Sequence, residues 1–260
     1  MPLRLTVLRW LLASALVTAA SAHAAGEVHR LETRPGITTT VFWEPAPSAR
    51  GTVLLLPGGD GGFGKLEDGR PTSRNFLVRS VPLFLERGLN VAVFGRPGDS
   101  HGLDYADRIA EPHLEDLRGA LEFARQRSAV PIWLVGTSRG TVSATAAALR
   151  WPELAQGLVL SASVVDRRKP GAVTSQALGA IRMPVLVLHH AHDACGVCRP
   201  QDVPEIVKRL TQSRVRSLVM LDGGAEPQGD ACGALHRHGF IGIEDKAVGV
   251  IADWIANPRP

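Results

Sequence analysis

The sequence predicts an α/β fold with a mostly parallel central sheet and helices on both faces. Two short segments, residues 52–56 and 184–188, are apolar almost throughout, which is typical of strands buried on both faces. Segments with strand character alternate with segments of helical periodicity along most of the chain. This alternation favours a parallel sheet that is covered by helices on each side.

The first 24 residues are predicted to be a secretory signal peptide and not part of this domain. Arg4 and Arg9 accompany a short apolar run over residues 10–20, and Ala22-His23-Ala24 fits an A-x-A cleavage pattern. We therefore expect cleavage before Ala25, an exported protein that is periplasmic or secreted, and one domain over residues 25–260. The apolar run is shorter than the roughly 20 residues of a membrane span. An uncleaved anchor is the alternative, and no later segment predicts a stable membrane span.

Two edge strands and a buried strand are expected to begin the domain. Residues 27–33 and 37–43 flank a turn, and the second segment is rich in β-branched and aromatic side chains. Residues 52–56 form the next strand and lead into a glycine-rich loop at 57–64. This loop lacks the G-K-[ST] ending of a phosphate-binding P-loop. Its backbone amides are instead expected to face an oxyanion, with an ordinary flexible turn as the alternative.

The remaining elements continue the alternation. Helical periodicity extends over 75–87, where Pro82 interrupts it, and over 111–127, where leucines and a phenylalanine form an apolar face. No long helical pattern occurs in residues 162–182. The other expected elements are strands at 89–94, 132–135, 157–161, 184–188 and 215–221, a polar loop at 95–105, and helices at 142–149, 203–210 and 240–255.

Ser138 lies between a strand and a helix in Gly136-Thr137-Ser138-Arg139-Gly140, which fits G-x-S-x-G. A serine on such a tight turn adopts a strained backbone, and the flanking glycines avoid clashes. The turn would project the hydroxyl beyond the sheet edge, above a helix N-terminus whose amides favour negative charge. An ordinary serine N-cap fits the same motif. The two interpretations are distinguished by whether a base and a carboxylate occur elsewhere in the chain to act with Ser138.

A nucleophilic serine needs a base and a carboxylate that orients the base, and both follow later strands. Asp193 follows the strand at 184–188, and His238 lies beside Gly239 just before the last helix. His236 is the alternative base, and Asp193 could instead cap the turn after it. The order serine, aspartate, histidine is that of α/β-hydrolases and differs from the orders in chymotrypsin and subtilisin.

The chain resembles the α/β-hydrolase superfamily over residues 53–255. The resemblance rests on the L-P-G-G-D-G loop, the G-T-S-R-G-T turn and the H-G-F segment before the last helix. It implies that Ser138 is the nucleophile, His238 the base and Asp193 the orienting acid. The implied activity is hydrolysis of an ester or related acyl bond in a small-molecule substrate, without a cofactor.

The resemblance also implies an oxyanion hole. The backbone amide of Arg139 would be one donor, and Gly59 or Asp60 would supply the other. The P-G-G-D sequence differs from the H-G-G-G of many lipases and esterases, which leaves the second donor open. The segment from 162 to 183 is short, so only a minimal lid is expected.

Three cysteines in an exported chain allow one disulfide and leave one thiol. If the triad forms, the loops that carry Cys195 and Cys232 meet, which favours a Cys195–Cys232 bridge. Cys198–Cys232 is the alternative pairing. Cys195-Gly-Val-Cys198 also fits C-x-x-C, so an exported thiol–disulfide redox protein is a rival interpretation.

Other functions are less consistent with the sequence. A metal site from His189, His190, His192 and the cysteines is disfavoured, because His189 and His190 are adjacent and neighbouring strand residues point to opposite faces. The net charge is +4 and no basic cluster with interleaved aromatics occurs, so no nucleic-acid partner is expected. The run at 167–169 is expected to be solvated. A non-catalytic binding protein on a hydrolase scaffold stays open, and the sequence indicates no particular oligomeric state.

Overall fold

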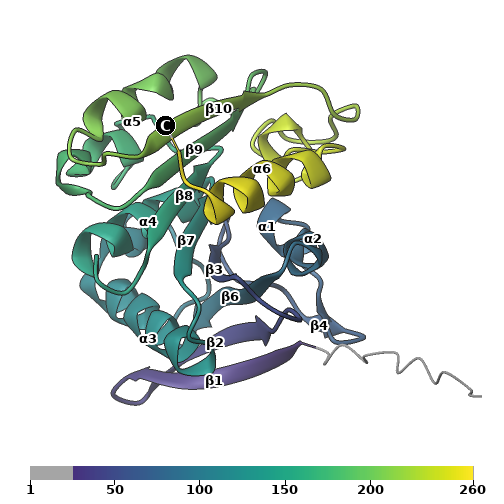
Figure 1. Cartoon of the computed structure of the whole chain (residues 1–260), viewed down its shortest axis with the longest axis vertical. Helices are drawn as coiled ribbons and strands as arrows, with labels where there is room; N and C mark the ends of the chain where they lie inside the picture. Colours follow the sequence, from purple (N-terminus) through teal and green to yellow (C-terminus); the bar gives the residue numbers. More distant parts are fainter. Residues whose placement is uncertain (1–25, 260) are drawn as a thin grey trace, which may run out of the picture.

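The computed structural model describes residues 26–259, so the predicted signal peptide lies outside the described residues (Figure 1). The predicted α/β class with a mostly parallel sheet is confirmed. The strand order of the main sheet is β1 (Glu27–Arg34), β2 (Ile37–Glu44), β6 (Leu89–Pro97), β3 (Gly51–Leu56), β7 (Ile132–Thr137), β8 (Gly157–Ser161), β9 (Val185–His190) and β10 (Arg216–Leu221). Strand β3 and strands β6 to β10 run parallel to one another, whereas β2 is antiparallel to both of its neighbours.

Helices cover both faces of this sheet. One face packs against α3 (Glu111–Arg127), α4 (Arg139–Arg150) and α5 (Pro204–Arg209). The opposite face packs against α1 (Phe76–Arg79), α2 (Val81–Glu86) and α6 (Glu244–Ala256), and Figure 1 shows these two groups on either side of the strands. The sheet therefore has an apolar layer on each face.

Strand β3 shows why the central strands are apolar at nearly every position. Leu54 and Leu56 belong to the core under α3 and α4, whereas Val53 and Leu55 belong to the core under α2 and α6. All four side chains are at most 1% exposed. Since successive strand side chains point to opposite faces, a strand with helices on both sides needs apolar residues at each position.

Three sequence-based expectations about the elements are wrong. Strand β2 is not an edge strand, because it pairs with β1 on one side and β6 on the other. The last helix begins at Glu244 and not at residue 240, because Phe240 and Gly242 have φ of 57° and 75°, which a right-handed helix does not accommodate. Strand β6 extends to Pro97, into the expected polar loop.

A small hairpin of β4 (Leu66–Glu67) and β5 (Arg70–Pro71) was not expected from the sequence. Pro82 lies in the first turn of α2, where the predicted interruption falls. Between β8 and β9 the chain forms only two short 3₁₀ turns (Val173–Ser175 and Leu178–Ala180), which agrees with a minimal lid.

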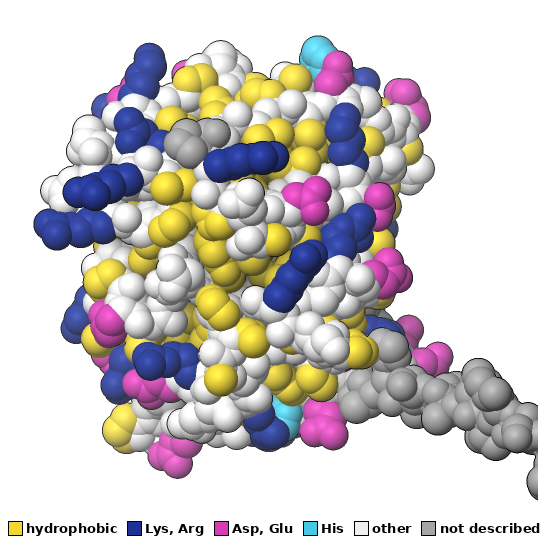
Figure 2. Space-filling model, in the orientation of Figure 1, with side chains coloured by type: hydrophobic (Ala, Val, Ile, Leu, Met, Phe, Trp, Pro, Cys, Tyr) yellow, Lys and Arg dark blue, Asp and Glu magenta, His cyan; other side chains and the backbone are white. Residues whose placement is uncertain are grey.

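The surface carries both charge signs. Figure 2 shows lysine and arginine side chains spread over one face with acidic side chains among them. Within residues 26–259, none of the helices combines the length and the apolar character that crossing a bilayer requires.

Candidate active site

Ser138 occupies a strained turn between β7 and α4. Its φ of 53° and ψ of −127° lie outside the regions that non-glycine residues usually adopt. A Cβ on Gly136 would lie 2.5 Å from the carbonyl oxygen of Gly140, and a Cβ on Gly140 would overlap the carbonyl oxygen of Leu56. Both motif glycines are therefore required by close backbone approach, as the sequence predicts.

Asp193 and His238 form a buried hydrogen-bonded pair. Asp193 follows β9, and His238 lies in a 3₁₀ turn (Arg237–Gly239) before α6. His238 Nδ1 donates to Asp193 Oδ2 over 2.8 Å, and both side chains are at most 5% exposed. Since Nδ1 carries the hydrogen, Nε2 is left with its lone pair. Nε2 is buried and has no hydrogen-bond partner in residues 26–259, which leaves it available as a proton acceptor.

Gly239 allows the loop that carries His238 to pack tightly, because a Cβ there would overlap the carbonyl oxygen of Ala234. His236, the alternative base, does not contact Asp193: its amide N–H donates to the carbonyl of Gly233, and its Nδ1 is buried without a partner in the described part of the chain. The geometry therefore favours His238 over His236.

Asp193 has further partners that the sequence did not reveal. His189 Nε2 lies 3.3 Å from Asp193 Oδ2 and 2.8 Å from the carbonyl oxygen of Cys198. The Cys195 amide donates to Asp193 Oδ1 over 2.9 Å, so Asp193 caps the following turn while it also binds His238. Burial tends to raise the Asp193 pKa, but hydrogen bonds from His189 and His238 outweigh burial and hold that pKa well below its usual range.

Ser138 and His238 line the same pocket of about 510 Å³, together with Gly58, Gly59 and Asp60. A Cβ on Gly58 would lie 2.7 Å from Ser138 Cβ, so this glycine lets the loop approach the serine. The hydrogen bond between the Ser138 hydroxyl and His238 Nε2 is not formed in the described structure. Such bonds often tighten only when substrate is bound.

The loop after β3 turns tightly beside Ser138. The Gly61 amide donates to the Gly58 carbonyl over 3.1 Å, and Gly59 between them has φ of 58°. The amides of Gly59, Asp60 and Arg139 donate to no backbone or side-chain acceptor in residues 26–259. These three amides are therefore the candidate oxyanion donors.

A buried arginine that the sequence analysis did not identify holds this loop. Arg108 is 1% exposed; its Nη2 donates to the Gly59 carbonyl over 2.9 Å and its Nη1 to Ser143 Oγ over 3.1 Å. Burial, and then the charge of Arg139, lower the pKa of Arg108 to about 10. No sequence signal marks this residue, because its contacts come from distant segments.

Cys195 and Cys232 form a disulfide that joins the loop of Asp193 to the loop before His238, with an S–S distance of 1.99 Å. This is the pairing that the sequence analysis favours, and Cys198 is the free, buried thiol. Sγ of Cys195, Sγ of Cys198 and a ring nitrogen of His238 lie within 4.8 Å of one another. Since the Cys195 sulfur is bonded to Cys232, only Cys198 and His238 are available there as metal ligands.

The histidines at the end of β9 and just after it belong to no group of three possible metal ligands in residues 26–259. His190 Nε2 bonds to the Gly223 carbonyl over 2.9 Å, whereas His189 faces Asp193 and Cys198. His192 is exposed beside Asp222. The adjacent histidines therefore diverge, as expected for neighbours at the end of a strand.

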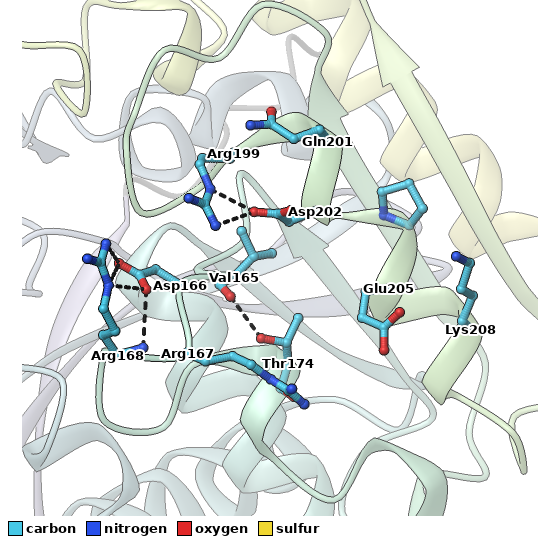
Figure 3. A pocket seen from close by; sticks show the side chains of 11 residues that line it. Val165, Asp166, Arg167, Arg168, Thr174, Arg199, Gln201, Asp202, Glu205 and Lys208 are labelled. Atoms are coloured by element: carbon cyan, nitrogen blue, oxygen red, sulfur yellow. Dashed lines mark hydrogen bonds and ion pairs between the residues drawn. The ribbon is translucent and has the colours of Figure 1, made fainter.

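A second pocket of about 530 Å³ lies between the loop after β8 and α5 (Figure 3). Four of its charged side chains form two ion pairs: Arg168 binds Asp166 at 2.8 Å, and Arg199 binds Asp202 at 2.6 Å. The residues that line it include no serine, cysteine or histidine. The pocket of Ser138 is therefore the better candidate for covalent chemistry.

Comparison with known proteins reveals similarity in structure only. No protein-family model matches the chain, and no curated protein matches it. An α/β serine hydrolase homologue from Coxiella burnetii is 17% identical, with a TM-score of 0.62, and the match covers 90% of this chain and 99% of that one. An α/β serine hydrolase without a lid from Xanthomonas campestris is 19% identical, with a TM-score of 0.61, over 90% and 97% of the two chains.

A third similar structure is an esterase from Pyrococcus furiosus, which is 12% identical with a TM-score of 0.65, over 89% of this chain and 90% of that one. All three matches extend over nearly the whole of both chains. Together with the strand order and the serine turn at the end of β7, they show that the chain has the fold of the α/β-hydrolase superfamily.

Proposed function

We propose that this protein is a serine hydrolase that cleaves an ester or related acyl bond through an acyl-serine intermediate. The observation that carries the proposal is the buried Asp193–His238 pair: His238 lines the pocket of Ser138, and its Nε2 has no hydrogen-bond partner in residues 26–259. A strained serine turn beside a base with an open lone pair is the arrangement that activates a hydroxyl for attack.

In the proposed reaction His238 Nε2 accepts the Ser138 proton while the serine oxygen attacks the carbonyl carbon of the substrate. The oxyanion that forms accepts hydrogen bonds from the Arg139 amide and from Gly59 or Asp60. His238 then donates its proton to the leaving alcohol. Water, activated by the same imidazole, releases the acid and restores the serine. Asp193 stays ionised throughout and stabilises the imidazolium.

Several features support a small, accessible substrate. The segment between β8 and β9 provides only two short 3₁₀ turns, so little chain is present to cover the pocket. Two of the similar structures are described as an esterase and as a serine hydrolase without a lid. We propose a small-molecule ester as the substrate, no requirement for a cofactor, and action outside the cytoplasm if the signal peptide is used.

A fluorophosphonate probe followed by peptide mapping tests the proposal, because such probes react much faster with activated serines than with ordinary ones. We expect labelling on the peptide that contains Ser138, and loss of labelling and of p-nitrophenyl ester hydrolysis in Ser138→Ala and His238→Ala. His236→Ala is the matched control and should retain both. Hydrolysis by Ser138→Ala at the wild-type rate would contradict the mechanism.

A non-catalytic binding protein on this scaffold is the second candidate. The observation that favours it is the missing hydrogen bond between Ser138 and His238. In that case the wild-type protein would show neither labelling nor hydrolysis, although it is folded and its pocket is open.

A further inference from the structure

The proposed hydrolytic mechanism leaves one reactive group of the pocket region unused, the thiol of Cys198. This thiol is 0% exposed, and its sulfur lies within 4.8 Å of both the Cys195 sulfur and a ring nitrogen of His238. A reduced thiol is therefore buried next to a disulfide and next to a base. These are the three components of thiol–disulfide exchange.

The backbone brings Cys195 and Cys198 together independently of the disulfide. The Cys198 amide donates to the Cys195 carbonyl over 2.9 Å, which closes a single turn. The Cα atoms across such a turn are less than about 7 Å apart, a separation compatible with a disulfide. Cys195 thus has two possible sulfur partners, Cys232, to which it is bonded, and Cys198.

We propose that Cys195, Cys198 and Cys232 form an intramolecular thiol–disulfide exchange site, in which the bridge transfers from Cys195–Cys232 to Cys195–Cys198. His238 Nε2 accepts the proton of the Cys198 thiol, and the sulfur electron pair forms a bond to Cys195 Sγ. The Cys195–Cys232 bond breaks, and Cys232 leaves as a thiolate that takes up the proton. One disulfide and one thiol are present before and after, so no external oxidant or reductant is needed.

The environments of the two thiols differ, so a chemical reagent can distinguish the protein before exchange from the protein after it. Burial raises the pKa of Cys198, and the nearby Asp193 carboxylate raises it further. A hydrogen bond with the Ser138 hydroxyl lowers this pKa, but by less than the other two effects raise it. Cys198 is therefore a protonated, inaccessible thiol before exchange. Cys232 is exposed, so the thiol that exchange releases is open to solvent and to small thiol-reactive molecules.

Differential alkylation of the folded protein tests this proposal without a substrate and without reductant. Native protein is treated with iodoacetamide at pH 8.5, then denatured, reduced, alkylated with an isotopically heavy reagent and mapped by mass spectrometry. We expect the light label to accumulate on Cys232, and a parallel unreduced digest to contain a Cys195–Cys198 bridge. In Cys198→Ser, light labelling of Cys232 should be lost.

His238→Gln is a second variant, in which light labelling of Cys232 should slow because the proton acceptor is missing. Light label on Cys198 alone, no light label at all, or equal labelling of Cys232 in wild type and Cys198→Ser would each overturn the proposal. Cys198→Ala repeats the comparison if Cys198→Ser does not fold. Because no hydrolysis is measured, failure here is separate from failure of the proposed hydrolase function.

Discussion

His238 presents one ring nitrogen to Asp193 and keeps the other free, since Nδ1 lies 2.8 Å from Asp193 Oδ2 while Nε2 is buried without a partner in residues 26–259. A carboxylate can only accept this hydrogen bond, so it selects the tautomer with the proton on Nδ1. In this tautomer the lone pair on Nε2 is free to accept the proton of a serine hydroxyl. The pair therefore sets the protonation state of the site as well as its geometry.

Asp193→Asn tests this control of the tautomer. An asparagine can still accept from the Cys195 amide, but its NH₂ group can donate to Nδ1 and leave the imidazole proton on Nε2. We expect kcat for p-nitrophenyl acetate to fall by about 10⁴ while the circular dichroism spectrum is unchanged. His236→Gln serves as the control and should stay within twofold of wild type. A folded Asp193→Asn variant within about tenfold of wild type would exclude the orienting role.

Arg108→Met tests whether the buried guanidinium positions the oxyanion loop. The change removes the donor to the Gly59 carbonyl, so the amides of Gly59 and Asp60 are no longer held in place. We expect kcat to fall by about 10²–10³, the effect of losing one oxyanion donor, with little change in KM. Arg108→Lys keeps one donor and should recover part of the rate.

The control for Arg108 is Arg125→Met, an exposed position on α3 that should keep wild-type kinetics. If Arg108→Met and Arg108→Lys lose thermal stability but have unchanged kcat, the arginine is structural only. A loss of kcat with unchanged KM indicates that Arg108 positions the oxyanion loop. A purely structural role would not lower kcat alone, because destabilising the whole fold does not act only on the transition state.

Gly140→Ala and Gly249→Ala are expected to change stability in opposite directions. A Cβ on Gly140 overlaps the Leu56 carbonyl, so the backbone must move and the protein is destabilised. Gly249 lies inside α6, where a Cβ meets only the end of the Arg87 side chain at 3.7 Å, and alanine should stabilise by about 0.5–1 kcal/mol. Urea unfolding measures both, and a Gly140→Ala variant as stable as wild type would show that the turn can relax.

The sequence predicts those features of the molecule that depend on local patterns. Apolar runs identify β3 and β9 because a strand covered on both faces needs apolar residues throughout, and the glycines around Ser138 identify the turn. Arg108 was missed because its acceptors, the Gly59 carbonyl and Ser143, come from two other segments. The partners of His189 and the pairing of β2 also depend on contacts between distant segments. The left-handed residue Phe240 carries no signal, since phenylalanine rarely adopts that conformation.

The last prediction concerns the pH dependence of stability and rests on His113. This side chain is 4% exposed; its Nε2 lies 2.9 Å from Ser143 Oγ, and its Nδ1 has no partner in residues 26–259. Burial, then the positive charges of Arg108 and Arg34, lower the pKa of His113 to about 3. The unfolded chain, where a histidine titrates near its usual pKa of about 6.5, therefore binds a proton that the folded protein does not.

The contribution of His113 to the free energy of unfolding is consequently complete above about pH 6.5. It is lost as the pH falls toward 3, at about 1.4 kcal/mol per pH unit. Between pH 6.5 and 5 the loss is about 2 kcal/mol in the free energy of unfolding. His113→Gln has no titrating group and should show a decline smaller by that amount, whereas the exposed control His101→Gln should follow wild type. Urea unfolding at pH 7, 6 and 5 gives the three curves. If the wild-type and His113→Gln curves are parallel, the burial of a neutral imidazole does not govern the acid sensitivity of this fold.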